Sequence, residues 1–95
     1  MVTVVWDTWL KSDAMEEGLS LTRRIWSDMQ GFEGYISHVI LVDQDEVGHI
    51  LVVSEWKNRD IPDRLRTEYA SAEPVQRLLP LLARPRDRWV CSRDE

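Results

Sequence analysis

The chain has 95 residues, of which 43% are hydrophobic and 31% are charged, and it carries a formal net charge of -5 at pH 7. This length predicts a single domain over residues 1–95, and the hydrophobic content excludes a disordered chain. The negative charge offers no basic field to a phosphate backbone, so we expect no nucleic acid as a partner.

The single cysteine, Cys91, cannot form an internal disulfide, and no histidine or other cysteine stands around it at metal-ligand spacing. We therefore expect no metal site, and a reducing cytoplasm is the simplest location. No apolar stretch reaches the ~18 residues that a membrane span requires, and no charged segment followed by an apolar run opens the chain. The sequence thus predicts a soluble, cytoplasmic protein with no membrane partner.

Residues 2–10 are predicted to form a strand, and a helix follows it. Asp13 and Glu16 have the spacing of a capping box, which predicts Asp13 as the N-cap. The helix ends at Gln30-Gly31. Its apolar stripe consists of Met15, Leu19, Thr22, Trp26 and Met29.

Gly18 lies inside this predicted helix, where glycine costs about 1 kcal/mol relative to alanine. A glycine at such a position indicates that something approaches the helix closely. We interpret this as the packing of a strand, with the approach of a ligand as the alternative.

Two apolar strands around an acidic turn occupy the segment from Gly31 to Trp56. A strand with one exposed face alternates apolar and polar residues, but Val39–Val42 and Ile50–Val53 are apolar throughout. Both faces of this hairpin must therefore be shielded from water. A chain of this length has enough helix for one face, so we expect a second copy to cover the other in a homodimer.

The second helical region is predicted to start near Asp60 or Ile61, with Pro62 in its first turn. It is broken, since Ser71–Pro74 has the character of a new helix start. Arg86–Ser92 is the last predicted strand. The order strand, helix, strand, strand, helix, strand is that of the ferredoxin-like α+β fold, an antiparallel sheet with helices on one face.

Arg84, Arg86 and Arg88 form the one basic cluster of the chain. We interpret them as solvated charges that protect an edge strand from further pairing. The alternative is a local contact with a phosphate backbone.

The order of elements, with GFEGY after the first helix and VVSEWKNRD leading into the second, resembles the antibiotic biosynthesis monooxygenase (ABM) domain family over nearly the whole chain. The resemblance implies a dimeric α+β barrel, in which two sheets face each other and each subunit has a pocket between its sheet and helices. It also implies, as one of several activities in the family, the oxidation of anthrone-like polyketides or quinols by dioxygen without a metal or flavin.

The resemblance extends to haem-degrading relatives, which use an Asn on the first strand and a Trp and a His on the second helix. The only Asn here is Asn58, no histidine follows His49, and Arg64 or Leu65 stands where that Trp is expected. We therefore do not expect haem degradation by that mechanism.

Cofactor-free oxygenation requires a dry pocket and a group that accepts a proton or stabilises an anion. His38 and His49 are the candidate bases, because histidine titrates near neutral pH, and Asp7 ranks third. If paired positions in the hairpin add up to an odd number, both imidazoles share a face about 7–8 Å apart. If the sum is even, the two imidazoles lie on opposite faces of the sheet. The alternative role is a hydrogen-bonded histidine of the core or of an interface.

Five tryptophans in so short a chain are suited to binding a flat aromatic molecule, although they are equally suited to a hydrophobic core. The candidate substrate-binding residues are Trp6, Trp9, Trp26, Tyr35, Trp56 and Tyr69.

The sequence therefore predicts a cofactor-independent monooxygenase that oxidises a small aromatic or polyketide substrate of the anthrone or quinol type, with no cofactor. The alternative is a dimer of the same fold that binds a hydrophobic small molecule without oxygenating it, as a polyketide cyclase does. A third possibility, a dimer that holds partner proteins, predicts a filled or absent pocket.

Overall fold

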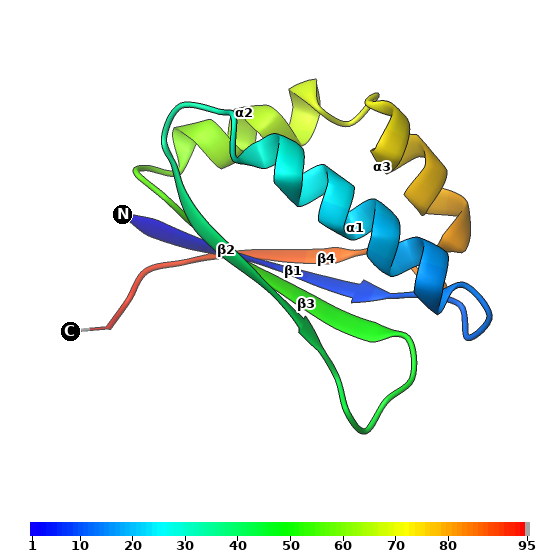
Figure 1. Ribbon diagram of the computed structural model, residues 1–95. Coiled ribbons are helices and arrows are strands. Elements are labelled where there is room, and N and C mark those ends of the chain that lie inside the picture. The colour runs from blue at the N-terminus through cyan, green and yellow to red at the C-terminus, as the bar shows by residue number, and fades with distance from the viewer. Residues whose placement is uncertain (95) are drawn as a thin grey trace.

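In the computed structural model, which describes residues 1–94, the helices cover one face of a four-stranded antiparallel sheet (Figure 1). The elements in chain order are β1 (Val2–Trp9), α1 (Met15–Met29), β2 (Tyr35–Val42), β3 (His49–Trp56), α2 (Asp60–Glu68), α3 (Glu73–Leu78), the 3-10 helix η1 (Leu79–Leu81) and β4 (Asp87–Cys91). The strand order is β2-β3-β1-β4. This topology confirms the predicted ferredoxin-like α+β fold.

The core lies between the sheet and the helices. Alternate side chains of β1 and β3 point to the helices, and Val4, Ile50, Val52 and Trp56 are at most 1% exposed. These residues are β-branched or aromatic, which suits a pleated surface that is covered on one side. Helix α1 adds Leu21, Ile25 and Met29 from its buried stripe.

Helix α1 begins at Met15 with Ala14 at its N-cap, and no side chain caps it, so the predicted capping box at Asp13 and Glu16 is wrong. The reason is the tight turn before the helix, in which the Ala14 N–H donates to the Lys11 carbonyl at 2.9 Å. This turn places Asp13 one residue too early to reach the first helical N–H groups.

The close approach at Gly18 comes from the end of the first strand. A Cβ atom at this position would lie 2.5 Å from Leu10 Cδ1, well inside van der Waals contact. The packing interpretation of Gly18 is therefore confirmed.

The second helical region is broken as predicted. Pro62 lies in the first turn of α2 and Pro74 near the start of α3, and the last strand, Asp87–Cys91, lies inside the predicted range. None of the helices among the described residues has the length and apolar character of a membrane span.

The hairpin register separates the two histidines. Paired positions add up to an even number, as in Val42 opposite Ile50, and His38 pairs with the buried Ser54. His38 therefore points to the helices. His49 pairs with Trp9 of β1 and points to the opposite side.

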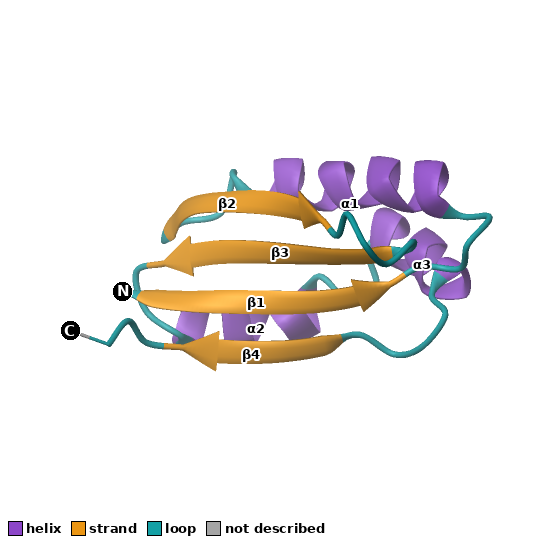
Figure 2. Ribbon diagram, turned by 90° about the horizontal axis from the view of Figure 1, so that it is seen from below, coloured by secondary structure: helices purple, strands orange, loops and turns teal. Residues whose placement is uncertain are grey.

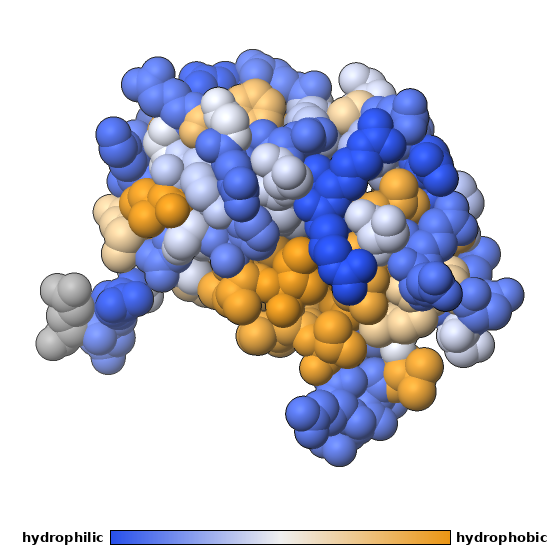
Figure 3. Space-filling model, viewed as in Figure 1, coloured by the Kyte–Doolittle hydropathy of each residue, from blue (hydrophilic) through white to orange (hydrophobic). Residues whose placement is uncertain are grey.

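We call this opposite side the outer face of the sheet. Figure 2 looks onto it, with the helices behind the strands. It carries Val5, Asp7, Trp9, Val39, Leu41, His49, Leu51, Val53, Glu55 and Trp89. Val39, Leu41 and Trp89 are 46–48% exposed, and Figure 3 shows apolar side chains gathered below the helices. The apolar run on both faces of the hairpin thus has cover on one face only.

Candidate functional site

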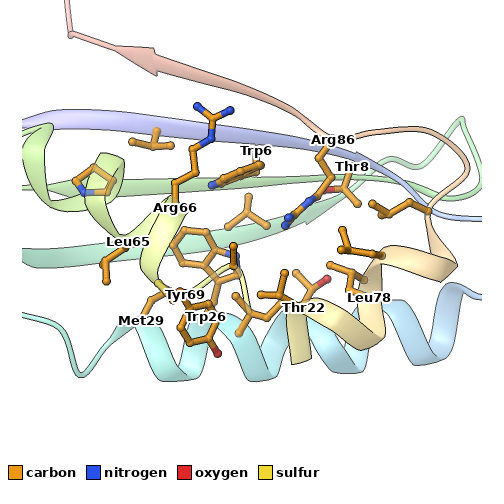
Figure 4. A pocket seen from close by; sticks show the side chains of 18 of the residues that line it. Trp6, Thr8, Thr22, Trp26, Met29, Leu65, Arg66, Tyr69, Leu78 and Arg86 are labelled. Atoms are coloured by element: carbon orange, nitrogen blue, oxygen red, sulfur yellow. The ribbon is translucent and has the colours of Figure 1, made fainter. Parts of the chain in front are cut away.

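A cavity of about 330 Å³ lies between the inner face of the sheet and the helices (Figure 4). Strands β1 and β3 form its floor, with Trp6 and Trp56 among the lining residues. Helix α1 contributes Thr22 and Trp26, and α2, α3 and the segment before β4 close the remaining sides. The volume lies within the range of small-molecule sites.

Three of the predicted tryptophans, Trp6, Trp26 and Trp56, line this cavity together with Tyr69. The ring centroids of Trp26 and Trp56 are 6.5 Å apart. Trp56 is fixed because its Nε1–H donates to Ser54 Oγ at 3.0 Å, and Ser54 donates to the Val4 carbonyl. The cavity therefore has rigid aromatic walls of the kind that accommodate a flat ring system.

The mouth of the cavity is marked by those lining residues that are exposed to solvent, namely Arg66, Ala70, Leu79 and Pro85. They come from α2, the turn after it, η1 and the segment before β4. A ligand would thus enter between the second helical region and the last strand.

The polar groups of the lining side chains are cations, hydroxyl groups and the indole N–H groups of the tryptophans. Arg66 and Arg86 carry the charges, Thr8, Thr22 and Tyr69 carry hydroxyls, and none of the lining residues in the described chain is an Asp, a Glu or a His. The Tyr69 hydroxyl donates to Asp28 at 2.5 Å. Burial and this hydrogen bond raise the pKa of Tyr69 far above its usual value, so it stays protonated at neutral pH.

His38 and Tyr35 lie beside the cavity rather than in its wall. The His38 ring packs 5.5 Å from the Trp26 ring, and Tyr35 OH and His38 Nδ1 share a hydrogen bond of 2.5 Å. Burial lowers the pKa of His38, which favours the neutral imidazole at pH 7. Tyr35 also packs edge-on against Trp56, at 5.6 Å between ring centroids. Both residues therefore support the tryptophans of the lining.

His49, Asp7 and Trp9 form a separate cluster on the outer face. Asp43 completes it, since its Oδ2 lies 2.7 Å from His49 Nδ1, while His49 Nε2 bonds to Asp7 Oδ1. Trp9 stacks on the imidazole at a centroid distance of 4.2 Å. The sheet thus separates these three predicted site residues from the cavity.

This outer cluster predicts a stability that depends on pH. The hydrogen bond to Asp43, followed by that to Asp7, raises the pKa of His49 above 6.5 even though burial opposes it. The same bond lowers the pKa of Asp43. Protonated His49 therefore stabilises the fold fully below pH 6.5, and this contribution is lost as the pH rises through the raised value. As the pH falls through the lowered pKa of Asp43, the stabilisation that this carboxylate contributes to the fold is lost as well.

We expect His49→Asn to lower the melting temperature by several degrees at about pH 6 and by much less at about pH 9. Melting curves of both proteins across this range, followed by circular dichroism, measure the difference. If the difference in melting temperature between the two proteins were the same at pH 6 and pH 9, the raised pKa of His49 would be contradicted.

The three arginines of the basic cluster lie in three different environments. Arg84 places its guanidinium 4.4 Å from the Trp9 ring centroid, and Arg86 lies 4.6 Å from that of Trp6. Arg88 donates to Asp63 at 2.7 Å, and its side chain is only 9% exposed. The interpretation as solvated charges therefore holds for Arg84, which is exposed, and is wrong for Arg86 and Arg88, which lie partly buried against Trp6 and Asp63.

No family model matches the amino-acid sequence, and no curated protein does. Solved structures, in contrast, are similar over nearly the whole chain. The cofactor-independent oxygenase SnoaB from Streptomyces nogalater matches 99% of this chain and 93% of its own, with a TM-score of 0.86 and 17% sequence identity. A second structure, described as an antibiotic biosynthesis monooxygenase, matches the full length of both chains, with a TM-score of 0.79 and 21% identity.

These likenesses establish the fold. The chain has the ferredoxin-like α+β architecture of ABM structures, which confirms the resemblance predicted from the order of elements and the two sequence motifs.

Proposed function

We propose that this protein is a cofactor-independent monooxygenase that oxidises a small aromatic or polyketide substrate of the anthrone or quinol type with dioxygen. The observation that carries the proposal is the cavity of about 330 Å³ with three tryptophans in its wall. The likeness of the fold to SnoaB, a cofactor-independent oxygenase, supports the same reading.

The reaction needs no redox cofactor, because the substrate supplies the electrons and dioxygen accepts them. An anthrone loses a proton from its CH₂ group, and the anion gives one electron to dioxygen. The two radicals combine to a hydroperoxide, which loses water to leave a ketone. One CH₂ group and one dioxygen molecule thus become one carbonyl group and one water molecule, with all electrons supplied by the substrate.

The protein's part in this reaction is to hold the ring system, exclude water and stabilise the anion. Trp26 offers an apolar face for stacking, and Trp6 holds the guanidinium of Arg86 in the same lining. Among the described residues, the lining carries cations and hydroxyls and no carboxylate or imidazole, so we propose that it stabilises the anion while water at the mouth accepts the proton. A base role for His38, His49 or Asp7 stays a prediction. His49 and Asp7 would have to act from the far side of the sheet.

Oxygen uptake with 1,8-dihydroxyanthrone tests this proposal. We expect the protein to accelerate uptake over buffer, and Ala70→Trp, which places an indole at the mouth, to reduce that rate about tenfold or more. Ala83→Trp is the matched control, since Ala83 is also exposed but does not line the cavity. Uptake no faster than in buffer would overturn the monooxygenase assignment.

The second candidate function is binding of a hydrophobic small molecule, or its cyclisation, without oxygenation. The lack of a histidine or carboxylate among the lining residues of the described chain favours it. In this case, the anthrone would bind and quench tryptophan fluorescence, and dioxygen would not be consumed.

We also propose that two copies of the chain associate through the outer face of the sheet. Support comes from the apolar side chains of β2, β3 and β4 on this face, of which Val39, Leu41 and Trp89 are nearly half exposed. Exposed apolar surface of this kind typically marks an interface. A two-fold axis would let the same patch cover itself, as in the predicted dimeric α+β barrel.

A further inference from the structure

Arg86 brings a positive charge into the cavity. It immediately precedes β4, and its side chain reaches over the Trp6 ring with its guanidinium directed into the space between the sheet and α1 (Figure 4). Stacking on Trp6 at 4.6 Å leaves the edge of the guanidinium, with its N–H groups, available to a ligand.

No partner within residues 1–94 neutralises this charge. Arg86 forms no ion pair or side-chain hydrogen bond there, whereas Arg88, two residues further on, bonds to Asp63 at 2.7 Å. Arg77 likewise contacts Glu17 and Glu73. Burial lowers the pKa of Arg86, but a guanidinium remains protonated at neutral pH. The cavity therefore contains a partly desolvated cation without an anion.

The remaining charge of the cavity has the same sign. Arg66 stands at the mouth, and the lining residues within the described chain include no carboxylate. This is a positive site in a protein whose formal net charge is -5. A cationic ligand would be repelled, and a neutral ligand would leave Arg86 uncompensated, so the site is complementary to an anion.

We propose that the natural ligand is an aromatic molecule with an ionised oxygen, as in a carboxylate, phenolate or enolate, and that Arg86 binds this oxygen. The planar guanidinium suits such a group because two parallel N–H groups can donate to it. The inference rests on the proposed function in assuming a flat aromatic ligand, and it names the chemical class that the cavity selects.

The test compares 2-naphthoate with 2-naphthamide, which have the same shape and differ in charge. We expect the wild-type protein to bind 2-naphthoate about tenfold or more tightly in calorimetry at low salt. In Arg86→Met, this preference should disappear, while the affinity for 2-naphthamide stays within about twofold. Arg84→Met is the matched control, because Arg84 stacks on Trp9 with similar geometry but outside the cavity. It should keep the preference.

The wild-type comparison requires no variant and decides the matter even if Arg86→Met fails to fold; Arg86→Gln provides a second removal of the charge. Equal affinity of the wild-type protein for both probes, or no binding of either at millimolar concentration, would overturn the proposal. So would a preference for 2-naphthoate that survives in folded Arg86→Met. This assay measures no oxygen, so failure of the monooxygenase assignment would leave its result standing.

Discussion

Replacement of Ile50 by alanine should lower the free energy of unfolding by roughly 2–5 kcal/mol. Ile50 is 0% exposed, at the second position of β3, and it pairs with Thr8 of β1 and Val42 of β2. Alanine would leave a void in the core between the sheet and the helices, and pairing of β3 with both neighbouring strands resists collapse of the backbone into it. Urea unfolding at neutral pH, monitored by tryptophan fluorescence, measures the loss.

Val47→Ala provides the control within the same hairpin. Val47 is 74% exposed in the turn between β2 and β3, so the substitution should change the free energy of unfolding by no more than about 0.5 kcal/mol. An equal effect of the two substitutions would contradict the position of Ile50 in the core.

Replacement of Leu41 by glutamate should dissociate the proposed homodimer into monomers. Leu41 lies on the outer face opposite Leu51 and is 46% exposed, so a second copy seated there would bury the new carboxylate without a partner. Light scattering coupled to size-exclusion chromatography, at protein concentrations in the micromolar range, measures the change from dimer to monomer.

Val47→Glu adds the same charge to the same hairpin but at a position 74% exposed in the turn, and it should remain dimeric. A wild-type protein that elutes as a monomer under these conditions would remove the homodimer proposal itself. Circular dichroism of Leu41→Glu distinguishes dissociation from unfolding.

The fold was accessible from the sequence because its signals are local. The apolar run of Ile50–Val53, the turn residues and the prolines at 62 and 74 each mark an element within a few neighbouring positions. The order of those elements then left few topologies. The helix cap at Ala14 was missed, because the preceding turn, and not the Asp13 side chain, decides where the helix begins.

The candidate site was predicted only in part, since it depends on contacts between residues distant in the sequence. The turn between β2 and β3 does not fix the register by its composition, so the faces of His38 and His49 remained open. The bond between His49 and Asp7 joins residues 42 positions apart. Trp6, Trp26 and Trp56 were predicted as binding-site residues because tryptophan is large and the chain has five of them.

Arg86 was assigned to solvent because the sequence shows it only as one of three alternating arginines. The available signal was the spacing itself. Residues two positions apart in an extended segment lie on one face, and Arg86 and Arg88 both lie over the Trp6 ring. Arg84 precedes Pro85 and lies outside β4, and it contacts Trp9 on the opposite face.

Within residues 1–94, the cavity lining includes cations but no carboxylate or imidazole, and this limits the range of compounds that the proposed enzyme would transform. The acidity of each compound, instead of that of a side chain, would set how much of it is present in the oxidisable form. Strongly acidic enols would turn over, and feebly acidic ones would occupy the cavity as inhibitors. By favouring the ionised form, Arg86 would move this boundary toward weaker acids and so widen the substrate range.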